Sequence, residues 1–293
     1  VYYTPMISDL STDTNRGWIS GLGMGANYAG QVFGLLVTLP FATGAIKLFG
    51  APGRAQTLIP AIILFTVSAL PLLLKYKETE TSRIAAKISI SAEYSKVFQT
   101  VKTVFSIKNL SLLLIAYFLF SDALLTFSNN FPIFLEKVFS ATDSVKTYLT
   151  AGILILSGVG SLIFGKMSDK KGTKFALLLI LAFWIVFFPV FAFMPSLTAA
   201  AIICLIAGLF FGPVWGVSRA MVSEFTPREI EARSFSFYTL MERFGTFVGP
   251  ITWSIVLSVT AESGSTSYSY ALVGMGILVL IGFLVVRKIK VIY

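Results

Sequence analysis

Two acidic side chains stand well inside long apolar stretches of this 293-residue sequence. They are Asp122 and Glu242, and the rest of the 14 Asp and Glu residues lie in polar segments or at the ends of apolar ones. A charge at the centre of a bilayer costs about 2.5–3.5 kcal/mol on insertion scales, so each should face a cavity or a partner group. Asp122 could bind a substrate amine or carry a proton. The alternative is a structural hydrogen bond to a neighbouring helix.

Glu242 is followed directly by Arg243. Adjacent helical residues point about 100° apart, so the two side chains cannot both face one cavity squarely. The planar guanidinium of Arg243 could bind a carboxylate. The alternative is that each charge pairs locally, with Arg219 or Arg233 as the partner of Glu242.

Uncharged polar residues share these apolar stretches. Asn27 and Gln31 are four residues apart and so lie on one face of a helix. Each such residue could line a polar path, although a single one is more often a helix–helix hydrogen bond. The candidates are Asn27, Gln31, Tyr117 and Trp215.

The sequence has no histidine and one cysteine, Cys204, which stands in an apolar run. The commonest transition-metal ligand and the commonest catalytic base are therefore missing, and no internal disulfide can form. We expect no metal, no cofactor and no enzymatic activity.

The elements that must position these residues are transmembrane helices. Hydrophobic residues make up 56% of the chain and charged residues 13%, too few charges for a water-facing surface. A spanning helix needs about 20 mostly apolar residues. Eight runs meet that length, at 18–40, 57–74, 109–128, 147–166, 174–194, 197–218, 234–257 and 268–286.

Basic residues crowd the loops on one side of these runs. Nineteen of the 23 lysines and arginines fall on that side, and the other four are Lys47, Arg54, Lys137 and Lys146. The crowded side is predicted to be cytoplasmic. This asymmetry accounts for the net charge of +9 without a nucleic-acid partner.

Glycines and prolines indicate how the helices pack. Small residues four apart let two helices approach closely, as at Gly21 and Gly25, Gly30 and Gly34, and further glycines in the run 147–166. Pro213 and Pro250 should kink their helices.

The polar segment 75–108 carries one apolar helical face, formed by Tyr94, Val97, Phe98, Val101, Val104 and Phe105. That spacing predicts an amphipathic helix on the inner membrane surface. The alternative is a solvated connector.

The strongest local motif joins two spans on the cytoplasmic side, from Gly165 to Lys174. Its residues Gly165, Asp169, Lys170, Gly172 and Lys174 allow a tight turn, a helix cap and a cytoplasmic anchor. The segment resembles the signature loop of the major facilitator superfamily: glycine, three residues, aspartate, a basic residue, any residue, glycine and a basic residue. Thr173 departs from that pattern.

Further segments resemble the branch typified by the fungal vacuolar amino-acid effluxer of autophagy, which has many prokaryotic relatives. They are 15–23, 117–123, 218–219, 235–238 and 249–250. The resemblance implies an all-α membrane protein with the major facilitator fold, of which this chain holds the C-terminal eight of twelve helices. Residues 1–74 would end the N-terminal half (the tail of helix four, helices five and six). Residues 75–108 would form a cytoplasmic linker, and 109–293 the C-terminal six-helix half.

The resemblance implies a secondary transporter that moves a small solute, amino acids included, by alternating access. Trp215, Ala123 and Glu242 depart from the residues expected there, which weakens the transfer of that substrate. The alternative is a proton-coupled drug or metabolite exporter of another facilitator branch. Expected partners are a small-molecule substrate, a coupling proton and the bilayer, with a monomer in the plasma membrane of a prokaryote or the vacuolar membrane of a fungus.

Overall fold

The structure, a computed structural model, describes residues 7, 10–50, 54–75, 101–244 and 246–290. Within those ranges the chain is helical and has no β-strand. It divides into two compact units, residues 1–28 with 99–293, and residues 29–98. Helix α2 (Arg16–Ala42) contributes its first turns to the former and its remainder to the latter.

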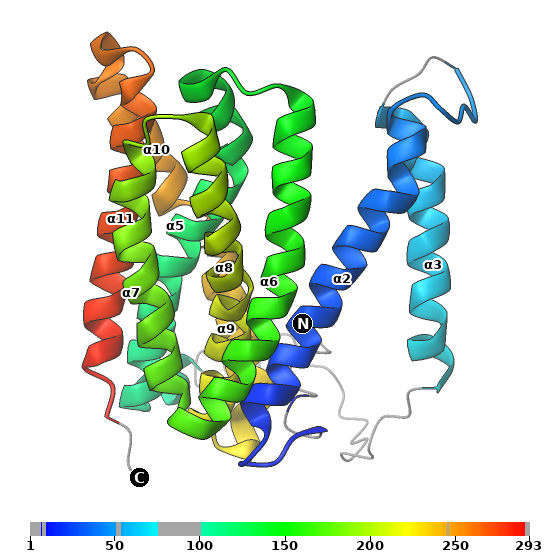
Figure 1. Cartoon of the computed structure of the whole chain (residues 1–293). Helices are drawn as coiled ribbons and strands as arrows, with labels where there is room; N and C mark the ends of the chain where they lie inside the picture. The colour runs from blue at the N-terminus through cyan, green and yellow to red at the C-terminus, as the bar shows by residue number, and fades with distance from the viewer. Residues whose placement is uncertain (1–6, 8–9, 51–53, 76–100, 245, 291–293) are drawn as a thin grey trace, which may run out of the picture. The chain divides into compact units, whose positions relative to one another are not determined.

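The larger unit is a helical bundle. Its long helices are α5 (Lys108–Phe139), α6 (Asp143–Lys171), α7 (Thr173–Ala192), α8 (Leu197–Phe225) and α11 (Thr266–Arg287). Each of them is long and apolar enough to cross a membrane, and they are the helices of the described chain that meet that criterion. Figure 1 shows them side by side, with the α5–α6 link at one end of the bundle and the α6–α7 link at the other.

The helix ends follow from local sequence. Thr142 and Ser196 accept N–H bonds from Val145 and Ala199 at the starts of α6 and α8, which satisfies backbone donors that a first helical turn leaves free. The predicted runs 147–166, 174–194 and 268–286 lie within or within two residues of α6, α7 and α11.

The run 234–257, which the sequence predicts as one kinked helix, is two helices. They are α9 (Glu231–Phe244) and α10 (Val248–Val259). Pro250 has no N–H to donate backward, and it occupies the first turn of α10, where no intrahelical donor is needed. The prediction of continuity was wrong because proline here starts a helix. By contrast, α8 continues past Pro213.

The smaller unit contains the rest of α2, the short helix η1 (Arg54–Thr57) and α3 (Leu58–Lys75). α3 covers residues 58–74 of the predicted run 57–74, and Thr57 ends η1. The buried side chain of Gln56 accepts N–H bonds from Leu48 and Phe49 at 2.8 and 3.2 Å and so fixes the turn before η1.

The predicted amphipathic helix falls largely on residues 76–100, outside the described residues. Residues 101–106 are helical. Val104 there is buried, and the Phe105 ring lies 6.4 Å from the Phe237 ring of α9 in an edge contact. On the predicted apolar face Val104 therefore packs against protein, whereas Phe105 makes a ring contact and stays 36% exposed.

Close glycine contacts set the helix spacing. A β-carbon at Gly160 of α6 would lie 1.9 Å from the carbonyl oxygen of Leu209, and one at Gly21 of α2 would lie 2.4 Å from that of Ser161. Both distances are far below any real contact, so these backbones pack directly on each other. The predicted close approach is confirmed at Gly21. At Gly30 and Gly34 an added β-carbon would meet nothing within 4 Å.

Candidate functional site

A single residue of the signature motif, Gly172, separates α6 from α7. Gly172 has φ +88° and ψ 146°, and it ends α6 and begins α7. A side chain is strained in that conformation, so only glycine turns the chain this sharply without cost. The prediction of a tight glycine turn is confirmed.

Asp169 caps the start of α2. Its carboxylate accepts the backbone N–H groups of Gly17 and Trp18 at 2.6 and 2.8 Å. A β-carbon at Gly17 would lie 1.9 Å from the Ser168 hydroxyl. A carboxylate near free N–H groups at a helix N-terminus is stabilised by hydrogen bonding and by the helix dipole. The motif therefore joins two segments 152 residues apart.

Lys174, the last residue of the motif, binds another helix end. Its ammonium donates to the carbonyl oxygens of Arg287 and Ile289 at 3.2 and 2.6 Å, where α11 ends. Thr173 donates to Glu224 near the end of α8 at 2.6 Å. Thr173, which stands where the family pattern has a basic residue, thus has a hydrogen-bond partner on another helix. Lys170 is exposed.

Asp122 is wholly buried in the middle of α5. Its carboxylate accepts the backbone N–H of Gly249 at the start of α10, and the Thr126 hydroxyl lies 3.4 Å away. From the sequence, we predicted that this residue binds a substrate amine, carries a proton or makes a structural hydrogen bond. The structure places it at the break between α9 and α10, as the cap of the second half-helix.

Glu242 meets the other candidates of α5 and α8. The Tyr117 hydroxyl donates to the Glu242 carboxylate, and the Tyr117 ring stacks on that of Tyr238 at 4.0 Å. The Tyr238 hydroxyl is 3.4 Å from the carbonyl oxygen of Trp215. These four residues form one cluster between α5, α8 and α9, which we call the tyrosine cluster. Arg243, the next residue of α9, is exposed.

The remaining candidates lie elsewhere. Asn27 and Gln31 are exposed on α2. Their neighbour Tyr28 is buried, and its ring occupies the position that a β-carbon at Gly212 of α8 would approach to 2.7 Å. Among the described residues no three acidic or cysteine side chains gather as a metal site would require.

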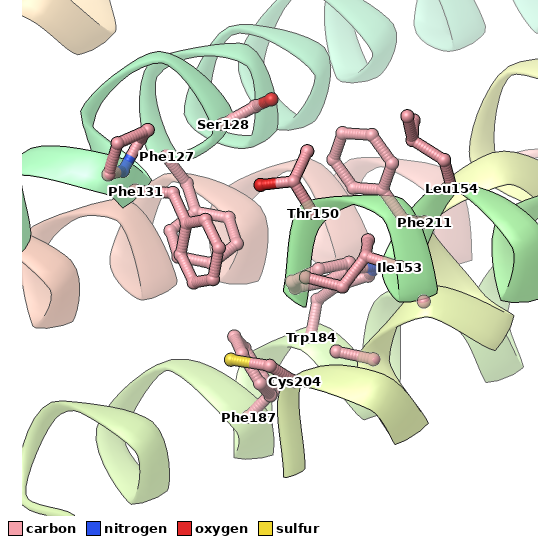
Figure 2. A pocket seen from close by; sticks show the side chains of 13 residues that line it. Phe127, Ser128, Phe131, Thr150, Ile153, Leu154, Trp184, Phe187, Cys204 and Phe211 are labelled. Carbon is pink, nitrogen blue, oxygen red and sulfur yellow. The ribbon is translucent and has the colours of Figure 1, made fainter. Parts of the chain in front are cut away.

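A cavity of about 110 Å³ lies inside the bundle (Figure 2). Four helices, α5 to α8, contribute its walls. None of the residues named as candidates lines it. Its lining residues are Phe127, Ser128, Phe131, Pro132, Thr150, Ile153, Leu154, Trp184, Phe187, Cys204, Ala207, Gly208 and Phe211.

The only signal for this cavity in the sequence is the combination of aromatic residues on α5 and α7 with small residues on α8. Phe127 and Phe131 are four apart, as are Cys204 and Gly208. The same spacing also builds solid cores, as at Leu110 and Leu114 of α5, which are four apart and fully buried. Spacing alone therefore does not separate a cavity from a filled core.

Comparison with known proteins agrees with the motif. The family model of the Major Facilitator Superfamily matches residues 3–250 and 113–291. An uncharacterized protein of Aquifex aeolicus is 25% identical over 99% of this chain and 68% of its own length. The uncharacterized MFS-type transporter YxiO of Bacillus subtilis is 20% identical over 92% and 63%. A multi-drug resistance efflux pump PmrA homolog of Lactococcus lactis is 26% identical over 49% and 35%. The chain thus spans about two thirds of the length of the first two relatives.

Proposed function

The chain belongs to the major facilitator superfamily, and on that premise we propose that it acts in secondary transport, moving a small solute across a membrane by alternating access. The observation that carries the proposal is the interrupted helix α9–α10, whose second half begins at the buried carboxylate of Asp122. Broken helices inside a membrane protein are tolerated where their free backbone groups are satisfied, and they are typical of transporter sites.

The break gives the bundle a hinge. α9 and α10 are short, and their backbones are joined only through residues 245–247. Because Asp122 of α5 binds the first turn of α10, α10 would move with α5, and α9 would tilt separately once its own bond to α5 is released. The tyrosine cluster joins α5 to α9. A solute or proton that competes for Glu242 would break the hydrogen bond from Tyr117 and allow α9 to tilt. We assign substrate or proton handling to this cluster, with Asp122 and Arg243 as further candidates.

The signature loop would act as a cytoplasmic latch. Asp169 holds the first turn of α2, and Lys174 holds the end of α11. Both bonds join helix ends that lie far apart in the sequence. Breaking them would release α2 from α6 at that end, and re-forming them would close the cytoplasmic side.

We propose a small solute as the substrate and assign it to no narrower chemical class. The amino-acid substrate of the resembled branch depends on positions where Trp215, Ala123 and Glu242 depart, and Trp215 here is buried with its carbonyl facing Tyr238. The twelve-helix arrangement, the two-half division, the monomeric state and the membrane of residence remain part of the proposal.

Two experiments test this. The protein reconstituted in liposomes should accumulate at least one solute of a chemically broad panel, amino acids included, under an imposed pH gradient or by counterflow. The Asp169→Ala variant should reduce that uptake. Uptake no greater than in protein-free liposomes, for every solute and both gradient directions, would contradict the proposal.

Topology is tested separately. In a Cys204→Ser background, Lys170→Cys and Lys146→Cys lie 24 residues apart on α6, about 36 Å along the helix axis at 1.5 Å per residue. An impermeant thiol reagent should label the two from opposite membrane faces. Labelling from the same face would remove the membrane arrangement on which transport depends.

A further inference from the structure

The cavity between α5, α6, α7 and α8 is closed on one side and open on the other. Trp184, Phe187 and Cys204 on the closed side are 1–2% exposed. Ser128 and Pro132 are exposed, so the mouth of the cavity lies beside them on α5. A molecule could therefore enter past α5 and come to rest against α7 and α8.

The cavity wall has no charged residue. Five of its lining residues are aromatic, and the Phe127 ring meets the rings of Trp184 and Phe187 edge-on at 5.9 and 5.7 Å. Aromatic rings favour edge-to-face contact with one another. An ionised ligand would lose its hydration here without gaining a partner. The lining therefore favours an uncharged aromatic ring.

Most polar side chains of the cavity wall already form hydrogen bonds within the protein. The Trp184 indole N–H donates to the Phe210 carbonyl at 3.2 Å, and the Thr150 hydroxyl donates to the Lys146 carbonyl at 2.8 Å. The Thr150 oxygen can still accept a hydrogen bond, and Figure 2 shows it directed toward the side chains of α5. A ligand with one O–H or N–H donor matches that oxygen.

The volume sets the size of the ligand. An apolar cavity of about 150 Å³ in another protein stays dry and binds benzene, and this one is about 110 Å³. We propose that this cavity is a binding site for a small uncharged aromatic molecule with a single ring and one hydrogen-bond donor, with phenol as the simplest example. The proposal does not depend on transport, because binding is measured without it.

Cys204 gives a direct readout because it is the sole cysteine and lines the cavity. In the protein held in lipid nanodiscs, phenol at ten times its dissociation constant should slow modification of Cys204 by methyl methanethiosulfonate about tenfold, by mass action. Benzoate, which is charged at neutral pH, and cyclohexane, which is apolar but not aromatic, should slow it less than twofold. Equal protection by cyclohexane and phenol would indicate an acyl-chain site and overturn the proposal.

A second measurement covers the case in which Cys204 reacts too slowly. The ¹⁹F signal of 4-fluorophenol should broaden in the presence of the protein and sharpen again when unlabelled phenol competes. Ala207→Leu, which fills the cavity, should abolish the broadening. Ala201→Leu, on the same helix and outside the lining, should preserve it. Absence of broadening with the unaltered protein, or equal broadening with both variants, would refute the site.

Discussion

Replacing Asp122 separates its role as a helix cap from any role of its charge. Asp122→Ala removes the acceptor of the Gly249 N–H, which then stays buried without a partner. Such a loss costs about 1–3 kcal/mol. At about 2–4 °C per kcal/mol for domains of 150–250 residues, the loss of this hydrogen bond alone lowers the melting temperature by about 2–12 °C.

Asp122→Asn keeps an oxygen that can accept the same N–H. It loses only the attraction between a carboxylate and the positive end of α10, about 0.3–1 kcal/mol and up to about 2 in partly buried sites. Both variants lose this attraction, and both remove a buried charge that costs about 2.5–3.5 kcal/mol in a bilayer, so these terms cancel between them. The asparagine variant should therefore melt about 2–12 °C above the alanine variant.

The assay is thermal melting in detergent beside uptake in liposomes across a range of pH. Thr126→Val is the matched control, because its hydroxyl lies at 3.4 Å from Asp122 and the carboxylate stays in place. Unchanged uptake by Asp122→Asn at every pH would defeat the proton or substrate role and leave the cap. If the asparagine and alanine variants melt at the same temperature, the capping argument is wrong.

Three further predictions concern the motif and the tyrosine cluster. Asp169→Ala, compared with the exposed Lys170→Ala, should lower the melting temperature and uptake, because two N–H groups of α2 lose their acceptor; the lysine variant should melt unchanged. Gly172→Ala should destabilise the fold by about 1–3 kcal/mol in a denaturation series, because φ +88° strains any side chain. Tyr117→Phe removes the donor to Glu242, so uptake should fall while ring stacking keeps the melting temperature within a few degrees; uptake equal to that of the unaltered protein would exclude Glu242 from the mechanism.

Helix positions were predictable because the bilayer fixes their length. Runs of about 20 apolar residues carry their own boundary signal, so 174–194 lies within two residues of the bounds of α7. α8 continues beyond the predicted run 197–218 to Phe225. Arg219 and Glu224 end the uncharged apolar run that hydropathy detects, although the helix itself continues. The break before α10 was not predictable as such. Gly249 and Pro250 are compatible with a kink or a break, and the acceptor that stabilises the break comes from Asp122, 127 residues earlier.

For the candidate site, the sequence identified individual residues but not how they are arranged in space. Gly172 acts through its own backbone torsions, so its role could be predicted from the sequence alone. The partner of Glu242 could not, because sequence reasoning offered nearby arginines, whereas the tyrosine hydroxyl comes from a helix 125 residues away. The cavity could not be predicted for the same reason. Its volume depends on where Ala207 and Gly208 of α8 meet the aromatic rings of α5 and α7.

The two carboxylates that the structure places at helix starts share one physical logic. Asp169 binds the first turn of α2, and Asp122 binds the first turn of α10. In both cases the carboxylate accepts backbone N–H groups, which cannot be titrated or exchanged for another side chain, and Asp122 also has the Thr126 hydroxyl at 3.4 Å. A bond of this kind holds a helix end in register with another helix and lets the far end of that helix tilt. Interfaces built this way, with glycines such as Gly21 where the backbones meet, suit helices that rock as rigid rods about fixed ends, which is the motion that alternating access requires.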